Sequence, residues 1–416
     1  DVVFSYDADW GNTDSHFPYV YDYFSETLRD RRSFNQEFRI VSDSADFLQD
    51  SFIEWVVGAN YLELKESNFK KDDGLYGDPT DPYGPYASAS SSSSRYKSSN
   101  ISVFGNLDYL LSASLKFSIG LRVEDWEANY SDSLKESFNP SDKMSGGKIS
   151  LIKNMTNDTN MYASLAKGYK QGGFNLGLGL DANSTNKNLA YDPEFLTNYE
   201  LGINTKLLDS KVTFNGVLFY SDREDQQVLI STQTDPSDPN TFSFLTQNAA
   251  EGVNQGLEIN MDMDINESLS AFVNLGILKT EIKNWESRQD LEDRAQAHAP
   301  ERSYALGFNW APTSHTYLAI DFTGKSSFYY SDSHNNKSKS YVLTNLNLGY
   351  VKNNWNYELW ARNIFDEYYS VRGFYFGNEA PNFIDTLYER HGDPRHIGLS
   401  IRSVSYTHLT LPTRLS

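Results

Sequence analysis

The most constraining feature of this sequence is a strict alternation of apolar and polar side chains. In residues 114–124 (SLKFSIGLRVE) every second side chain is apolar, and the residues between are polar, charged or glycine. Residues 257–265 (LEINMDMDI) repeat the pattern. Successive side chains of a β-strand point to opposite faces, whereas a helix would scatter this pattern around its circumference. The sequence therefore predicts strands with one apolar and one polar face, and we count about sixteen of them.

The connections between these strands alternate in length. Brief links of turn-forming residues fall at 111–114, 208–211, 264–268, 311–315 and 352–355. Long polar segments fall between them, at 67–97, 131–143, 175–194, 222–252, 286–302, 331–339 and 373–393. Tight turns join adjacent antiparallel strands, so this alternation predicts a meander with short turns at one end and long loops at the other.

The chain has no segment of 18 or more apolar residues, which excludes a helical membrane protein. A transmembrane barrel needs only about 9–11 alternating residues per strand, and its outer face carries aromatic girdles. The sequence contains 28 Tyr, 25 Phe and 7 Trp, and the predicted apolar faces carry such aromatic residues near their ends. A soluble sandwich would have shorter strands, of about 5–6 residues. We therefore predict an all-β transmembrane antiparallel barrel with short periplasmic turns and long extracellular loops.

A barrel in lipid assigns the two faces of each strand to different surroundings. The side chains predicted to face lipid are Leu115, Phe117, Ile119, Leu121, Val123, Leu257, Ile259, Met261, Leu306 and Phe308. Those predicted to face the lumen are Lys116, Arg122, Glu124, Glu258, Asp262 and Asn309.

Charge and composition exclude several functions. The formal net charge is -20, which argues against a protein that neutralises nucleic-acid phosphates. The absence of cysteine excludes disulfides, thiolate metal sites and a cysteine nucleophile. The closest histidine pair, His391 and His396, is five residues apart, so neither a His-x-x-x-His motif nor a companion set of carboxylates at ligand spacing is present. No nucleophile with its base is evident. We therefore expect no enzyme, no metal site and no cofactor.

Five segments resemble TonB-dependent outer-membrane receptors, in the order that the family has them. They are residues 161–175 (MYASLAKGYKQGGFN), 199–222 (YELGINTKLLDSKVTFNGVLFYSD), 253–259 (VNQGLEI), 360–369 (WARNIFDEYY) and 392–402 (GDPRHIGLSIR). In the last two, the matching positions are Asn363, Phe365, Asp366, Tyr369, Gly392, Pro394, Arg395, Gly398 and Leu399. The resemblance spans roughly residues 34–402.

The resemblance implies a barrel of about 22 strands whose lumen is plugged by an N-terminal domain. It also implies import of a scarce large solute, such as a ferric siderophore, energised by the TonB system. This sequence starts directly in strand-like residues at 2–10, so we expect a fragment that lacks the plug, with residues 1–402 forming part of the barrel. The implied partners are outer-membrane lipid, a ferric chelate or other large solute, and the TonB complex through the missing region. We expect a monomer in the bacterial outer membrane. A passive porin-like channel or a surface-binding barrel is the alternative.

Aromatic residues at two loop-side strand ends are the candidate ligand contacts. Neighbours in a strand face opposite ways, so one ring of each adjacent pair must point inward. Lipid-facing girdle residues and ligand contacts are both compatible with this pattern. The candidate ligand-binding residues are Tyr329, Tyr330, Arg372, Tyr375, Phe376 and Arg390.

The last residues differ from the rest of the chain. Ile397, Leu399 and Ile401 complete the final outward face, and residues 403–416 (SVSYTHLTLPTRLS) carry no clear alternation. Family members end almost directly after the sequence corresponding to GLSIR. We therefore predict that residues 403–416 are a non-native tail.

Overall fold

The computed structural model describes residues 2–12, 19–42, 53–77, 82, 84–133, 137–175, 190–233, 242–285, 288–377 and 384–403. Its main sheet has 17 strands. They are β1 (Val2–Asn12), β2 (Tyr19–Val41), β3 (Ile53–Gly77), β4 (Tyr86–Ser112), β5 (Leu115–Asp132), β6 (Ser137–Phe138), β7 (Ser141–Asn154), β8 (Thr159–Lys170), β11 (Glu194–Leu207), β12 (Val212–Gln233), β13 (Phe242–Asn266), β14 (Leu269–Lys283), β15 (Arg302–Thr313), β16 (Thr316–Lys325), β17 (Tyr341–Lys352), β18 (Trp355–Arg362) and β21 (His396–Ser403). Without the two-residue β6 there are sixteen, as the sequence predicts.

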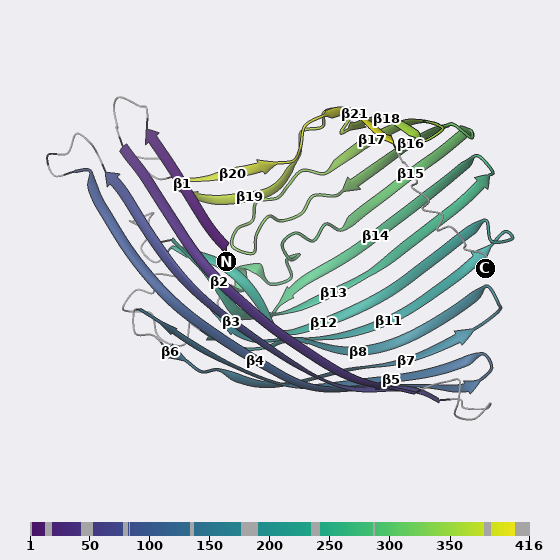
Figure 1. The fold of residues 1–416 in the computed structure, drawn as a ribbon, viewed down its shortest axis with the longest axis horizontal. Helices are drawn as coiled ribbons and strands as arrows, with labels where there is room; N and C mark the ends of the chain where they lie inside the picture. Colours follow the sequence, from purple (N-terminus) through teal and green to yellow (C-terminus); the bar gives the residue numbers. More distant parts are fainter. Residues whose placement is uncertain are drawn as a thin grey trace, which may run out of the picture.

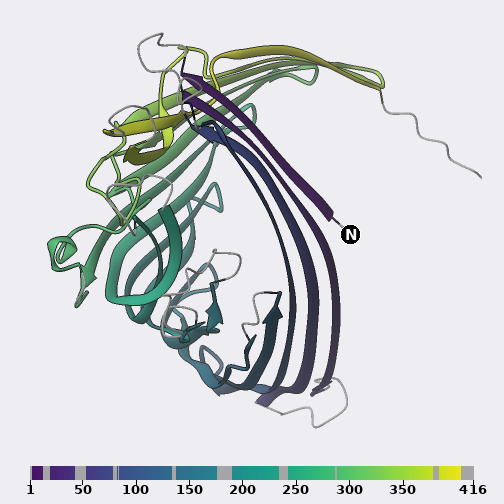
Figure 2. The same ribbon diagram turned by 90° about the vertical axis from the view of Figure 1, so that its left-hand side faces the viewer.

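Each long strand pairs antiparallel with the next one along the chain. Two small hairpins interrupt this order: β9 (Gly173–Phe174) with β10 (Ala190–Tyr191), and β19 (Ser370–Gly377) with β20 (Asp385–His391). The sheet curls into a trough-shaped wall (Figures 1 and 2). Among the described residues, β1 pairs only with β2, and β21 pairs only with β18.

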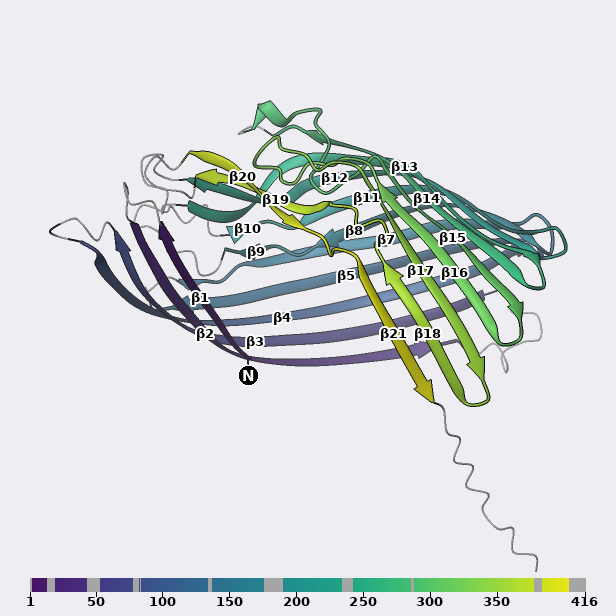
Figure 3. The same ribbon diagram turned by 90° about the horizontal axis from the view of Figure 1, so that it is seen from above.

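The short links lie at one end of the sheet, as predicted. Residues 113–114, 208–211, 267–268, 314–315 and 353–354 form the turns between paired strands. Asp209 and Asn353 adopt positive φ angles of 56° and 54°, which Asp and Asn tolerate better than most residues. The β19–β20 hairpin lies at the opposite end of the sheet (Figures 1 and 3). We call this opposite end the loop end.

Two of the predicted long loops are wrong. Most of segment 67–97 belongs to β3 and β4, and much of segment 222–252 belongs to β12 and β13. These strands have 22 to 27 residues, at least twice the roughly 9–11 that a membrane crossing requires. Their loop-end parts pair through the backbone but lack the regular apolar and polar alternation of the membrane-crossing parts. A search for an apolar face therefore misses them.

Segment 373–393, also predicted as a loop, contains most of the β19–β20 hairpin. Segments 131–143 and 175–194 are only partly loop, because β6, β7 and β10 fall within them. Residues 176–189 and 404–416 lie outside the described residues. The prediction of a non-native tail therefore stays a prediction, and Ser403 itself ends β21.

The two faces of β5 differ as expected. Leu121 and Val123 are 64% and 59% exposed, and Val123 lies opposite Val103, which is 62% exposed. Directly opposed residues share a face, so apolar exposure continues from strand to strand. Glu124 and Trp126 lie on the other face and are 8% and 0% exposed. A soluble surface rarely keeps such a continuous apolar band, which is the expected outer surface of a barrel in lipid.

Helical structure contributes little. η3 (Gln289–Leu291) is one 3-10 turn. In the described part of the chain, no helix is both long enough and apolar enough to cross a membrane.

Candidate functional site

Three connections meet at the loop end. They are residues 288–301 after β14, residues 326–340 between β16 and β17, and the β19–β20 hairpin. We call them together the loop-end cluster. Antiparallel order brings them together, because all three leave strands that run toward the same end (Figure 3).

Residues 288–301 are anchored to the strands of the wall by an apolar cluster and by a backbone hydrogen bond. Leu291 is fully buried with Trp285, Ile282 and Val228. The backbone N–H of Gln296 donates to Thr280 Oγ1 at 3.0 Å. These contacts hold a connection without regular structure at a fixed place on β12 and β14.

Arg294 joins this segment to residues 326–340. Its Nη1 donates to the carbonyl oxygen of His334 and to Asn335 Oδ1, both at 2.9 Å. Its Nη2 donates to the carbonyl oxygen of Ser331 and to Asp332 Oδ1, both at 3.1 Å. The side chain of Arg294 is only 7% exposed. Four acceptors, one of them a carboxylate, therefore compensate a buried charge that would be costly alone.

Tyr329 lies between two cations. The guanidinium carbon of Arg294 is 4.3 Å from its ring centroid, and Lys337 Nζ is 4.1 Å from it. Its backbone also bridges to Ala297 and to Lys337. The ring of Tyr329 is thus already occupied by cation–π contacts within the protein.

Tyr330 fastens the β19–β20 hairpin to the same loop. It is 2% exposed, its ring packs on Gly373, and its hydroxyl donates to a carboxylate oxygen of Glu389. Burial, followed by the bond to Glu389, raises the pKa of Tyr330 to about 12. The hydroxyl of Tyr330, in turn, lowers the pKa of Glu389. Both shifts describe one neutral donor that stays protonated beside a carboxylate.

Two histidines lie within the cluster. The His334 ring is 5.8 Å from that of Tyr375, and the His298 ring is 5.6 Å from that of Phe328. Burial lowers the pKa of both, and the positive charge of Arg372 lowers that of His298 further. Both imidazoles therefore favour the neutral form.

The hairpin has two chemically different faces. One face carries Gly373 and Tyr375 with their opposed partners Glu389 and Leu387, and it packs on residues 326–340. We call the other the arginine face. Its residues are Arg372, Phe374 and Phe376, opposed by Arg390, Tyr388 and Thr386. The guanidinium carbon of Arg372 is 4.6 Å from the Phe374 ring centroid, and the Phe376 and Tyr388 rings are 5.3 Å apart.

All six residues predicted to contact ligand lie in the loop-end cluster, but in different settings. Arg372, Phe376 and Arg390 share the arginine face, and Tyr375 lies on the packed face. Tyr330 is buried and Tyr329 is stacked between cations. Ligand contact by these six residues stays a prediction.

Sequence reasoning missed other members of the cluster. Phe374 has the same strand parity as Arg372 and Phe376, so alternation alone could have found it. Arg294, His298 and Glu389 gave no signal, because the contacts that place them in the cluster reach across 31 to 59 residues of sequence.

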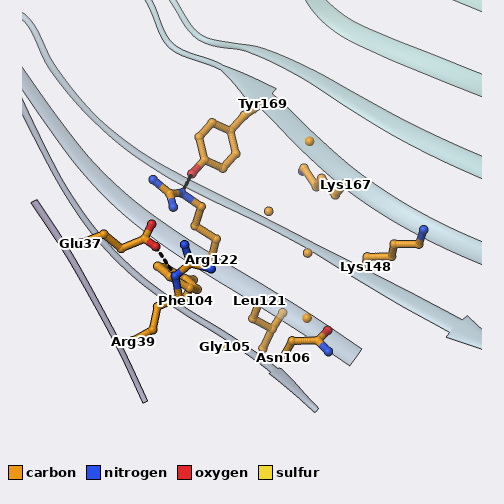
Figure 4. A pocket seen from close by; sticks show the side chains of 14 residues that line it. Glu37, Arg39, Phe104, Gly105, Asn106, Leu121, Arg122, Lys148, Lys167 and Tyr169 are labelled. Atoms are coloured by element: carbon orange, nitrogen blue, oxygen red, sulfur yellow. Dashed lines mark hydrogen bonds and ion pairs between the residues drawn. The ribbon is translucent and has the colours of Figure 1, made fainter. Parts of the chain in front are cut away.

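A hollow of about 560 Å³ lies on the wall formed by β2, β4, β5, β7 and β8 (Figure 4). Glu37 pairs with Arg39 at its rim. Arg122 Nη2 is 2.7 Å from Glu124 Oε2, and Arg122 Nε donates to the Tyr169 hydroxyl at 3.2 Å. The lining glycines are Gly105, Gly120, Gly146, Gly147 and Gly168. Its arginines lie beside carboxylates, whereas Lys148 and Lys167, which also line the hollow, have no carboxylate within ion-pair distance in the described residues.

Metal-binding chemistry is not evident in the part of the chain that the structure describes, where no group of three or more His, Asp or Glu side chains converges.

The fold and the loop-end cluster define a class: an antiparallel meander with an exposed apolar band, tight turns at one end and elaborated loops at the other. A family model described as "TonB dependent receptor-like, beta-barrel" matches residues 1–364. The chain belongs to the TonB-dependent receptor β-barrel family, and the family recognised from sequence motifs is confirmed.

Solved structures agree with this family. The ferric yersiniabactin uptake receptor FyuA from Yersinia pestis matches with a TM-score of 0.70 and 18% identity over 96% of this chain. The siderophore receptor PiuA from Acinetobacter baumannii matches at 0.64 and 16% over 95%. The copper transporter OprC matches at 0.67 and 13% over 92%. This chain spans 58%, 59% and 61% of those three chains, respectively. At such identities the likeness shows the fold alone.

Proposed function

We propose that this chain forms part of the barrel wall of an outer-membrane receptor. The receptor imports a large, scarce solute such as a ferric siderophore, and the TonB system supplies the energy for import. The family match over residues 1–364 is the observation that carries the proposal. Two structural neighbours, FyuA and PiuA, have ferric or siderophore ligands in their names. The receptor would act as a monomer in the bacterial outer membrane, with lipid against its apolar band and the TonB complex as its energy source. It would need neither cofactor nor nucleic acid and would catalyse no bond change.

Within this proposal the loop-end cluster receives the ligand. Arg372, Arg390 and Phe376 would contact it directly from the arginine face, and Tyr375 would meet it at the hairpin edge. Tyr329 and Tyr330 would support those contacts, since Tyr329 is stacked between Arg294 and Lys337 and Tyr330 is buried against Gly373.

Uptake in a deletion strain tests the proposal. Cells that lack this gene, and cells complemented with it, are given a panel of radiolabelled ferric chelates with and without a functional TonB protein. We expect complementation to restore uptake of at least one chelate, and loss of TonB to abolish that uptake. Uptake that persists without TonB would instead support a passive channel. Chelate binding to cells without uptake would support a surface-binding barrel.

A further inference from the structure

We infer that the arginine face of the β19–β20 hairpin binds an anionic, ring-bearing ligand, whose charged oxygens lie between Arg372 and Arg390. This inference rests on the proposed receptor function and specifies the chemical class of its ligand.

The first observation is the register of the two arginines. Arg372 and Arg390 lie directly opposite each other in the hairpin. Both are exposed, and in the described residues neither has a carboxylate within ion-pair distance. Like charges in directly opposed positions destabilise a pair of strands. An anion between the two guanidinium groups would convert that repulsion into two attractions.

Other cations of the loop end lie in different settings. Arg294 pairs with Asp332 at 3.1 Å, and Lys283 pairs with Asp293 at 2.6 Å. Lys337 contacts the ring of Tyr329 and has no carboxylate within ion-pair distance in the described residues. Arg372 and Arg390 differ from these cations because they lie directly opposite each other on one face of a hairpin.

Guanidinium geometry indicates what kind of anion fits. Arginine presents planar forks of donors that match carboxylate, phenolate or phosphate oxygens in pairs. Two such forks on adjacent strands can hold a ligand with at least two anionic oxygens. A neutral ligand would leave both charges without a counterion.

The rest of the face indicates a ring-bearing ligand. Phe374 lies beneath Arg372, and Phe376 with Tyr388 continues the same face. Arg372 and Phe376 are four residues apart, so the face extends about 13 Å along the strand, at roughly 3.3 Å per residue. Flat aromatic surface beside a guanidinium favours ligand rings that stack on it.

The opposite face of the hairpin holds this surface in place. Tyr330 packs on Gly373 and donates to Glu389, and His334 packs near Tyr375. A surface that is already ordered loses less conformational entropy when it binds. The contacts on the packed face therefore favour binding without touching the ligand.

Binding of three iron chelates to the full chain in lipid nanodiscs tests the inference. The ferric complex of 2,3-dihydroxybenzoate is anionic and aromatic, ferric citrate is anionic without rings, and a ferric trihydroxamate is neutral. Kd is measured by quenching of intrinsic fluorescence for the wild type, Arg372→Gln, Arg390→Gln and the double variant. Arg32→Gln, which removes a cation paired with Asp30 on β2, outside the loop-end cluster, is the matched control.

We expect the wild type to bind the dihydroxybenzoate complex most tightly. Each arginine substitution should raise that Kd about ten-fold, as expected for losing a charge-assisted hydrogen bond, and the control should leave it unchanged. Ferric citrate should bind more weakly and respond to the same substitutions. Equal binding of the neutral chelate, no binding of either anionic chelate, or no effect of the arginine substitutions would overturn the inference.

Two additional measurements distinguish a lipid ligand from a chelate and binding from transport. Displacement of the aromatic chelate by purified lipopolysaccharide, in an arginine-dependent way, would assign the site to lipid phosphate and overturn a chelate as its ligand. Arginine-dependent binding without TonB-dependent uptake would leave the anion site standing and refute the proposed transport.

Discussion

The ring of Tyr317 lies over Gly349, the residue directly opposite it in the β16–β17 ladder. A Cβ atom added at Gly349 would overlap the ring atoms of Tyr317. The same relationship recurs across the sheet, in the opposed pairs Phe104–Gly58, Tyr162–Gly202, Phe219–Gly256, Phe272–Gly307, Tyr304–Gly324 and Trp360–Gly398. Aromatic rings thus cover strand glycines, which otherwise weaken a sheet because they offer nothing to pack.

Replacing Gly349 by alanine should therefore destabilise the sheet. The methyl group has no room unless Tyr317 leaves its position, and such overpacking costs typically about 1–3 kcal/mol. Urea unfolding in detergent, followed by tryptophan fluorescence, measures the change. Gly168→Ala is the control, because a Cβ there meets nothing within 4 Å. Equal stability of the two variants would contradict the role given to the Tyr317 ring.

A second prediction follows from the assignment of lipid-facing and lumen-facing side chains, and it concerns two neighbouring residues of β13. Met261 lies opposite Phe214 and Val273, whereas Asp262 lies opposite Thr213 and Phe272. An arginine on the lipid side near the bilayer midplane costs about 2–4 kcal/mol, and lumen substitutions are tolerated. Met261→Arg should reduce folding into vesicles, as measured by the heat-modifiable gel shift, while Asp262→Arg should fold normally. The reverse ranking would mean that the register is wrong.

The strands and their turns were predictable because their signals are local. Alternation over 114–124 marks β5, and turn-forming residues at 208–211 mark the link between β11 and β12. The loop-end parts of β3 and β4 were not predictable, because the stretch from Ser88 to Ser94 consists of serine and alanine and has no apolar period. Backbone pairing with β3 makes it a strand.

The candidate site was only partly predictable. Aromatic pairs and nearby arginines pointed to Tyr329, Tyr330 and Arg372 from the sequence alone. Their different environments depend on long-range contacts, such as that of Tyr330 with Glu389, 59 residues later. Directly opposed arginines depend on the hairpin register, and a bulge between Ser370 and Arg372 shifts that register.

A third prediction concerns Asn363, which belongs to the family-like segment at residues 360–369. Its Nδ2 donates to the carbonyl oxygens of Glu367 and Asp393 at 2.9 and 3.1 Å, and its Oδ1 accepts from the Glu367 N–H at 2.8 Å. It is 4% exposed and has a positive φ of 46°. Asn363 therefore ties the exit of β18 to the entry of β21.

Asn363→Ala should lose these three bonds and the tolerance of positive φ. We expect it to lower the free energy of unfolding by about 2–4 kcal/mol, because three hydrogen bonds of a buried side chain are lost, each worth about 1 kcal/mol. Asn353→Ala, at a turn with a similar φ of 54°, isolates the backbone effect and should cost about 1 kcal/mol. The difference between the two unfolding energies measures the side-chain bonds, and no difference would argue against the tie.

The last prediction concerns acid. His298 and His334 have pKa values held below their ordinary value of 6.5, chiefly by burial. The charges that face them are Arg372, Lys325 and Asp332 for His298 and Arg294 for His334. A histidine whose pKa is lowered in the closed cluster binds a proton more readily once the cluster opens. The two histidines therefore leave the closed cluster fully stable above pH 6.5, and its stability falls as the pH drops below 6.5.

We expect faster hydrogen exchange in residues 326–340 at pH 5.5 than at pH 7.5, after correction for intrinsic rates. The double variant His298→Gln, His334→Gln should exchange equally at both pH values, whereas His315→Gln, at a short turn, should behave like the wild type. A pH effect that survives in the double variant would assign it to other groups.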